Sequence, residues 1–371
     1  MMKKHYLLAT MLAFASMVQA QVTDEEEDDD IDYGAVELVD GGMSKTYANS
    51  RIIGTSPQRF VSVGWDLQGP YDMTFSPIGS HPEGTEFAPN QLATGRAQYT
   101  GGFRLNANIP VISRNNLVWQ MGATYWDTRY NITDIAGNAS GQSVLNALNQ
   151  NGIRTGGINT TIYKPLGEYQ FVLVQASVDM SGDYGFGLQN EVRTSVAALW
   201  GKRPNDRKQW AVGLSRTYRV GAMNYIPIWL YNWTAPNRKW GIEALLPARG
   251  AVRYNINRNS MILAGFELEG QSYRMNSLSE NLVAAGLASG PGSLEIRRGE
   301  LRPRLEYMRQ LTGYFWLGVQ AGYRLNYSYD ADVLPGGKEF FRGFFGDQNF
   351  AMLNSIGNAP YAQITINFVS P

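Results

Sequence analysis

The stretch Ala97-Gln98-Tyr99-Thr100-Gly101-Gly102-Phe103-Arg104-Leu105-Asn106-Ala107-Asn108-Ile109 alternates two kinds of side chain. Apolar or small residues occupy the odd positions, and mostly polar residues occupy the even ones. Because successive side chains of a β-strand point to opposite faces, the pattern predicts a strand with one apolar and one polar face. The strand is longer than the roughly five or six residues that are typical of soluble proteins.

The same alternation recurs along the chain, at residues 117–125, 172–179, 210–215, 262–269, 301–307, 315–324 and 363–368. Alternation by itself also fits a soluble antiparallel sheet with one face in water, so a secreted soluble β-domain stays an alternative. Three features favour a transmembrane up-and-down antiparallel β-barrel instead. The segments reach the roughly ten residues that a tilted strand needs to cross a bilayer, small residues share the polar face with charges, and short connections alternate with long ones.

The connections give a strand count. Fourteen strands are predicted, beginning near residues 58, 95, 116, 155, 169, 192, 208, 223, 238, 249, 260, 294, 312 and 359. The turns after even-numbered strands are short, whereas every long connection follows an odd-numbered strand. Short turns at one end and long loops at the other are the outer-membrane arrangement, with both termini in the periplasm. The strands beginning near 223, 238 and 249 have the weakest pattern, which leaves twelve strands as the alternative count.

Aromatic residues give a second indication of a membrane barrel. In this topology they gather near the periplasmic strand ends (Trp119, Trp200, Trp210, Trp233, Trp240, Tyr307, Phe315 and Phe368) and near the outer ends (Tyr99, Tyr125, Tyr218, Tyr225, Tyr323 and Tyr361). Trp and Tyr prefer the headgroup level because each ring has an apolar body and a polar edge. Two such girdles are typical of outer-membrane barrels.

The composition excludes several classes of protein. The 371 residues contain no cysteine, which rules out disulfides, thiolate metal sites, cysteine nucleophiles and a lipoprotein anchor. Only His5 and His81 are histidines, so a multi-histidine metal centre is excluded and no metal or cofactor is expected. Lys plus Arg and Asp plus Glu are both 32, which gives no basic footprint for nucleic acid. The mean hydropathy of −0.28 argues against a bundle of transmembrane helices.

The beginning of the chain predicts a secretory signal peptide over residues 1–20. Lys3 and Lys4 precede an apolar run from Tyr6 to Val18, and Ala20 ends a stretch of modest side chains that suits a signal peptidase. The run is too short to span a membrane, and no later stretch reaches the ~18 consecutive apolar residues of a spanning helix.

Residues 21–57 are predicted to form an arm ahead of the barrel, which then occupies residues 58–371. The segment from Asp24 to Asp32 is almost entirely acidic, and charges this dense repel one another and stay solvated. The arm is therefore either a disordered acidic periplasmic tail or a lumen plug that docks on internal arginines.

Together these features resemble Gram-negative outer-membrane β-barrel proteins. The resemblance rests on the signal peptide, the alternating strands and the closing segment Tyr361-Ala362-Gln363-Ile364-Thr365-Ile366-Asn367-Phe368, and it covers about residues 58–368. It is to the class and to uncharacterised families of this length. It implies an outer-membrane location, contact with outer-membrane lipid, and insertion by the barrel-assembly machinery, which commonly recognises an aromatic residue ending the last strand. Here three residues follow Phe368, a departure from that pattern. An N-terminal hatch, as in fatty-acid transport barrels, is a further implication for the arm.

The alternation places a set of charged residues on the inner face of the barrel: Arg104, Glu243, Arg253, Glu267, Glu269, Arg302, Arg304, Glu306 and Arg324. Charges are tolerated there, whereas Arg costs ~2–4 kcal/mol on the lipid face at the midplane. One interpretation is a ladder of cross-strand ion pairs that stiffens the wall, with Glu267 and Glu269 beside Arg302 and Arg304. The other is a charged constriction that selects solutes.

Two apolar segments stand apart from the alternation. The last long loop contains Phe340, Phe341, Arg342, Phe344, Phe345 and Phe350, which should not all face water; they predict either packing against the barrel mouth or a folded-in lid. Residues 225–231 (YIPIWLY) are apolar on both faces, which predicts an apolar patch in the lumen, packing with the arm, or a homo-oligomer interface. Pro227 lacks a ladder donor and suits an irregular strand.

Enzymatic chemistry has little support in the sequence. A nucleophile needs a base beside it, and the only histidine after residue 20 is His81, in Ser80-His81-Pro82. We therefore expect no enzyme. Two functions remain: a passive channel or transporter for small solutes, and a non-conducting structural or complex-forming outer-membrane subunit.

Overall fold

The structure is a computed structural model, and it describes residues 52–183, 192–219, 222–275, 278, 294–333 and 349–369. All of these belong to one compact unit, Ser44–Pro371. The predicted signal peptide, most of the predicted arm, and Phe340, Phe341, Arg342, Phe344 and Phe345 lie outside the described residues.

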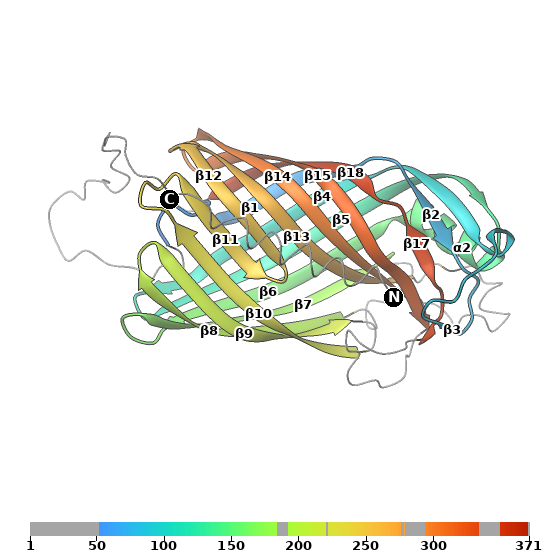
Figure 1. Ribbon diagram of the computed structural model, residues 1–371, viewed down its shortest axis with the longest axis horizontal. Helices are drawn as coiled ribbons and strands as arrows, with labels where there is room; N and C mark the ends of the chain where they lie inside the picture. The colour runs from blue at the N-terminus through green and yellow to red at the C-terminus, as the bar shows by residue number, and fades with distance from the viewer. Residues whose placement is uncertain are drawn as a thin grey trace. The chain divides into compact units, whose positions relative to one another are not determined.

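The described chain is dominated by long antiparallel strands (Figure 1). The strands that form the wall are β1 (Arg59–Gln68), β4 (Ala93–Arg114), β5 (Leu117–Ala136), β6 (Ile153–Pro165), β7 (Gln170–Gly182), β8 (Val192–Asn205), β9 (Lys208–Arg219), β10 (Ala222–Thr234), β11 (Trp240–Leu246), β12 (Arg249–Asn257), β13 (Ser260–Met275), β14 (Leu294–Thr312), β15 (Phe315–Val333) and β18 (Ala359–Val369). Each begins within a few residues of the predicted position.

The sheet closes on itself into a barrel of fourteen strands. Each strand pairs with its neighbours in sequence, and β1 pairs on one side with β18 (Val63↔Ile366) and on the other with β4 (Gly64↔Arg104). The predicted fourteen-strand up-and-down barrel is confirmed, and the alternative count of twelve is wrong. In the described part of the chain, no helix is long and apolar enough to cross a membrane.

The two ends of the barrel differ as the connections predict. At one end, here called the base, every connection is a short turn. At the other, the outer end, lie the long connections and two short ones, between β9 and β10 and between β11 and β12. The last of these turns contains the cis peptide bond Leu246–Pro247.

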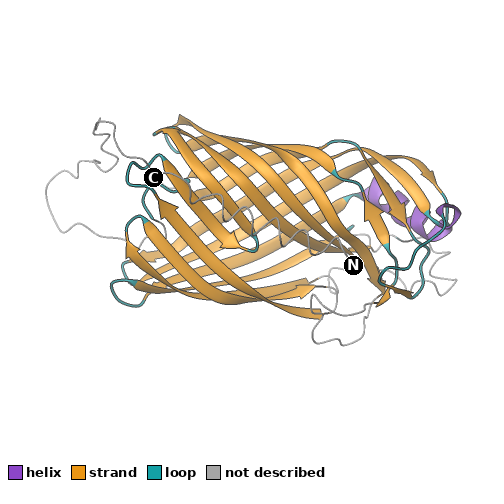
Figure 2. Ribbon diagram, viewed as in Figure 1, coloured by secondary structure: helices purple, strands orange, loops and turns teal. Residues whose placement is uncertain are grey.

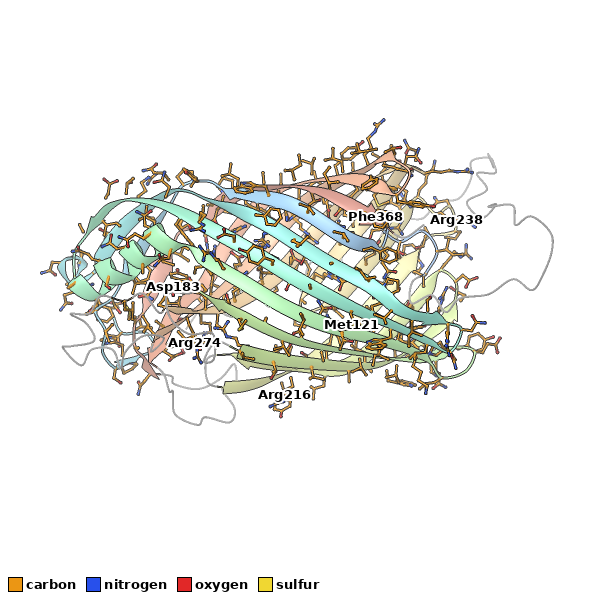
Figure 3. The ribbon with its side chains drawn as sticks, turned by 180° about the vertical axis from the view of Figure 1, so that it is seen from behind. Met121, Asp183, Arg216, Arg238, Arg274 and Phe368 are labelled. Carbon is orange, nitrogen blue, oxygen red and sulfur yellow. The ribbon has the colours of Figure 1, made fainter. Side chains whose placement is uncertain are left out.

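Apolar side chains face outward along the wall, and polar ones face inward. On β15, Val319 is 42% exposed while its neighbour Gln320 is 6% exposed. Met121 and Phe368 lie on the outer surface in the same way (Figure 3). A membrane-facing surface needs this arrangement, because lipid tails offer no partners to polar groups.

Two predicted outward-facing residues point inward instead. Tyr361 is buried in the lumen, where its hydroxyl accepts a hydrogen bond from Gln320 Nε2 at 2.7 Å, so it is no part of the outer girdle. Ala97 is fully buried because the register of β4 against β5 shifts between Ala97 and Tyr99. A bulge of this kind inserts one residue and reverses the faces on one side of it.

Above the membrane-length strands, the outer end is extended by short elements. β2 (Tyr71–Phe75) continues β1 along β4, and β17 (Asn354–Ile356) pairs with β2. β3 (His81–Pro82) and β16 (Asn349–Phe350) form a separate two-stranded sheet, and η2 (Pro89–Gln91) precedes β4. The first and last strands therefore each run on past a short break.

The helix α2 (Ala139–Asn151) connects β5 to β6 and lies at the outer end (Figure 2). Asn138 caps it, because its side chain accepts a hydrogen bond from the Gly141 amide at 2.7 Å. A Cβ atom at Gly141 would lie 2.5 Å from Cβ of Ala93, so only glycine lets the helix approach the strands this closely.

Candidate functional site

The interior of the barrel is the candidate site, and its outer end is filled by a hydrophobic core. This outer core joins side chains of the helix, such as Leu145 and Leu148, to inward-facing side chains of nine wall and extension strands, including Phe75, Ile132, Ile296 and Tyr329. Most of them are inaccessible to solvent. Within the described residues, the outer core fills the space between the helix and these strands.

The nine predicted lumen charges all lie on inward-facing positions, but they form three groups instead of one ring. Arg104, Glu267, Glu269, Arg302, Arg304 and Arg324 belong to a network just below the outer core. Glu306 lies nearer the base, where it pairs with Arg59. Glu243 and Arg253 pair with each other on β11 and β12.

Asp66 of β1 is the centre of one half of the network. Its Oδ2 atom lies 2.9 Å from Nη2 of Arg104 on β4 and 2.6 Å from Nη2 of Arg324 on β15. Arg324 also donates from Nη1 to Gln68 Oε1 at 2.9 Å. These bonds join β15 to β4 across the seam where β1 and β18 close the barrel.

The other half of the network runs along β13 and β14. Arg302 pairs with both Glu269 and Glu300, and Glu300 also lies 2.9 Å from Nη2 of Arg298. Arg304 donates to Glu267 Oε2 at 3.2 Å and to Gln320 Oε1 at 3.1 Å. Gln320 in turn contacts Tyr361, so a continuous set of polar contacts extends from β13 to β18.

The charges in the network nearly cancel. Five guanidinium groups (Arg104, Arg298, Arg302, Arg304 and Arg324) meet four carboxylates (Asp66, Glu267, Glu269 and Glu300). Buried charges persist only when they are paired and hydrogen-bonded, and such networks fix the arrangement of the groups that they join. The geometry therefore fits a structural role, in which the network holds this part of the wall in one arrangement. Selection of solutes by these charges stays a prediction.

The second group of charges holds the chain that leads into the barrel. Residues 52–58 lie at the base, where the Ile53 amide donates to the Asp206 carbonyl at 2.8 Å. The Ser56 amide and hydroxyl both donate to the Glu243 carboxylate at 2.7 Å, and the Arg253 Nε atom donates to the same carboxylate at 3.0 Å. The last residues of the predicted arm are thus bound to β11 inside the base.

Asp66, Arg298 and Glu300 are network members that our sequence prediction missed. Asp66 lies between the outward-facing Trp65 and Leu67, and Glu300 lies two residues before Arg302, so their alternation alone was sufficient to find them. Arg298 lies beyond Gly299, opposite a bulge in β15. At a bulge, the alternation of residue types predicts less reliably which face a side chain occupies.

A different lining covers the lumen side of β7 to β11. Here the inward-facing side chains include an aliphatic group, Leu173, Ile228, Leu230 and Leu245, which packs against a buried cluster that includes Phe171 and Leu199. This is the apolar lumen patch that residues 225–231 predicted. Ile228 and Leu230 are only partly buried, so they leave apolar surface open to the lumen.

Between the apolar lining and the outer core lies a cavity of about 350 Å³. It is bordered by β5 to β9 and by β13, and its polar lining includes Gln175, Ser177, Asp179 and Gln271. The indole N–H of Trp126 and the hydroxyl of Thr217, both in the lining, have no hydrogen-bond partner among the described residues. A polar cavity of this size can hold water or the polar part of a small molecule.

The remaining predicted sites are less informative. Phe350, the one described residue of the predicted loop lid, is buried on β16 opposite His81, with the Arg297 guanidinium 5.3 Å from its ring centroid. His81 Nε2 lies 3.0 Å from the Pro77 carbonyl oxygen, and its ring packs edge-on against Phe87. Across the residues that the structure describes, no group of three or more His, Cys, Asp or Glu could hold a metal ion.

Comparisons with known proteins locate the chain by its fold class. No protein-family model matches the sequence, and no curated protein matches it. Among solved structures, the COG4313 outer membrane channel from Pseudomonas putida F1 is 12% identical, with 89% of this chain and 100% of that chain covered and a TM-score of 0.34. A FadL homologue from Pseudomonas aeruginosa is 8% identical, with coverages of 84% and 90% and a TM-score of 0.35.

The outer membrane protease OmpT from Escherichia coli is also similar, at 9% identity, coverages of 84% and 95%, and a TM-score of 0.27. These neighbours include channels and a protease. The likeness is one of fold, to outer-membrane β-barrels, and the closed antiparallel sheet and its apolar exterior show the barrel independently.

Proposed function

We propose that the protein is a channel or transporter for small solutes in the outer membrane of a Gram-negative bacterium. The observation that carries the proposal is the internal cavity of about 350 Å³, which lies inside a barrel with an apolar exterior. A barrel that served only as an anchor could fill its interior with side chains, as small barrels do. The location implies contact with outer-membrane lipid and insertion by the barrel-assembly machinery.

Conductance and solute uptake by the purified protein test this function. We expect uptake into vesicles above the protein-free background, and we expect it to rise when residues 21–57 are removed, because Ser56 and its neighbours bind inside the base. A membrane that stays tight with both the full chain and the shortened chain would contradict a channel.

A non-conducting structural or complex-forming subunit is the second candidate. It is favoured by the outer core, which fills the outer end between the helix and the strands that it joins, and by the nearly neutral charge network below it. The apolar outward residues of β10, Tyr225 and Trp229, offer a surface for a second copy of the chain or another barrel. A stable oligomer in detergent without any solute uptake would favour this candidate.

We propose no enzymatic function. His81 is the only described histidine, and its Nε2 atom is occupied by the Pro77 carbonyl. Replacement of His81 by Ala should leave solute uptake unchanged; a peptidase or lipase activity that disappears in this variant would overturn the assignment.

A further inference from the structure

The barrel wall is interrupted on one side, between β10 and β13. Trp229 is the outermost residue of β10 that pairs with β11, and residues 222–228 pair only with β9. Arg249 of β12 pairs with Glu267, and beyond Leu268, whose amide donates to the Ala248 carbonyl at 2.7 Å, β13 pairs with β14 but not with β12. Figure 1 shows the β11–β12 hairpin ending part-way along its neighbours.

The outer side of this interruption is fixed by a contact between β13 and β7. Arg274 pairs with Gly182 in parallel, and the Asp183 amide donates to the Arg274 carbonyl at 3.2 Å (Figure 3). Close by, the Arg193 guanidinium of β8 lies 3.3 Å from Glu295 of β14 and donates to the Ser272 carbonyl. Among the described residues, the interruption is therefore bounded by β10, the β11–β12 turn, β13 and this contact.

Strand length places the opening at the outer boundary of the membrane. β11 has 7 residues and β12 has 9. With a rise of about 3.3 Å per residue and a tilt of about 40°, the hairpin reaches about 18–23 Å, close to the ~25 Å apolar band of an outer-membrane barrel. Open strand edges do not occur within the hydrocarbon layer, and here they begin where headgroups and water can satisfy them.

The cavity lies directly behind the opening. Gly270, Gln271 and Ser272 of the unpaired part of β13 contribute to its lining. On the other side, Thr217 contributes to the lining and pairs with Asn224 of β10. A molecule that entered between the two strands would therefore reach the cavity without crossing the outer core.

The β10 side of the opening is apolar, whereas its β13 side carries the polar residues Gln271 and Ser272. Tyr225 and Trp229 of β10 are exposed on the outside, at 41% and 50%. On the inside, Ile228 continues into the aliphatic lining with Leu230 and Leu245. The apolar β10 side lowers the free energy of the apolar part of a passing molecule, whereas the polar side chains of β13 can bind a polar group on the same molecule.

We propose that the gap between β10 and β13 is a lateral portal through which small, mostly apolar molecules exchange between the outer membrane interface and the lumen. This inference rests on the proposed channel function and names its route and its substrate class. The polar cavity then accommodates the one or two polar groups that such a molecule carries.

The absence of cysteine allows a direct test by single-cysteine labelling of the full chain. Tyr225→Cys places a thiol on the outside at the portal. Tyr323→Cys is the matched control, because Tyr323 has nearly the same exposure, 42%, and belongs to β15, where the wall is continuous. Both variants are treated with a bulky polyethylene-glycol maleimide on intact Gram-negative cells, whose lipopolysaccharide slows apolar compounds. The readout is the uptake rate of the apolar probe N-phenyl-1-naphthylamine.

We expect the label at position 225 to lower probe uptake several-fold and the label at position 323 to leave it unchanged. Ile226→Trp, which narrows the inner side of the portal, should lower uptake without any label, and a heat-dependent shift on a denaturing gel shows that each variant is folded. Uptake above that of cells without the protein, but insensitive to both changes at the portal, would overturn the portal and leave the channel intact. Uptake equal to that of cells without the protein would contradict the channel function itself.

Discussion

Two parts of the sheet have similar outward-facing surfaces and very different lumen-facing surfaces. The tall wall, formed by β13, β14, β15, β18, β1, β4 and β5, has strands of up to 22 residues and a lumen face of paired charges. The low wall, β8 to β12, has strands of 7 to 14 residues and a lumen face where the aliphatic residues Ile228, Leu230 and Leu245 accompany the single ion pair Glu243–Arg253. Both present Val, Ile and Leu to the exterior. The difference separates a wall that is held by many buried charge pairs from one with more aliphatic packing.

The physical basis of the division is the behaviour of buried charge. A network such as that around Asp66 and Arg302 fixes its members in one arrangement, because any shift leaves a desolvated charge without a partner. Aliphatic side chains such as Ile228 and Leu230 pack without directional bonds, so they tolerate a passing molecule. The proposed portal lies between the two kinds of wall, with β10 on one side and β13 on the other.

The largest effect is expected from breaking the charge network of the tall wall. Arg302→Ala leaves Glu269 and Glu300 without their shared partner, and removing one member of a buried ion pair costs about 3–5 kcal/mol. Heat or urea unfolding in detergent measures it. The control is Arg96→Ala, which breaks an exposed pair with Asp72 and should cost about 0–1 kcal/mol. Equal losses of unfolding free energy in the two variants would show that the network does not stabilise the wall.

The same kind of truncation should have unequal effects at two places in the lumen. Leu148→Ala removes a fully buried side chain from the outer core and should cost about 2–5 kcal/mol. Leu230→Ala, in the low wall, removes a partly exposed side chain and should cost about 1 kcal/mol. Unfolding in urea compares the two. A loss at Leu230 as large as that at Leu148 would mean that the low wall is packed and closed.

On the outside, the two walls should respond alike. Val319 of β15 and Val212 of β9 both face outward, each four residues from the start of its strand at the base. Replacing either by Arg should destabilise the barrel by about 2–4 kcal/mol in lipid. Folding in bilayers of defined composition measures the cost. If only one position were sensitive, only one wall would face lipid.

The smallest change in stability should accompany a clear change in transport. Ile228→Ser makes the low wall polar beside the portal and should alter the free energy of unfolding by less than about 1 kcal/mol, because the side chain is only partly buried. Uptake of the apolar probe should fall. Asn232→Ser, on the same face of β10, is polar before and after the change and should leave uptake unaltered. Equal uptake in both variants would separate the low wall from the solute path.

Alternation and turn spacing were sufficient to predict the strands. The positions of Val319, Gln320 and Arg324 follow directly from a period of two. The same rule failed at Ala97, because a bulge is set by the register of two strands and not by one sequence. It also failed for Tyr361, whose ring is held inward by Gln320 and by Arg324, 5.0 Å from its centroid.

The outer core and the portal could not be predicted from the strands. Helix α2 carries a local signal, Asn138 before a run with spaced apolar residues, but its contacts with Phe75 and Ala93 depend on distant strands. The proposed portal depends on where neighbouring strands of the described chain are not hydrogen-bonded to each other. The length of β11 was visible in the sequence, whereas the contact between Arg274 and Gly182, about ninety residues apart, was not.

The outer core also means that two different solvents stabilise this barrel. Its side chains are driven together by water, so urea and cooling should weaken it as they weaken a soluble domain. The strands in lipid are held by backbone hydrogen bonds that have no competitor in the hydrocarbon layer. The outer core and the membrane-spanning strands can therefore unfold separately. If the outer core unfolds first, a shorter, intact barrel stays in the membrane.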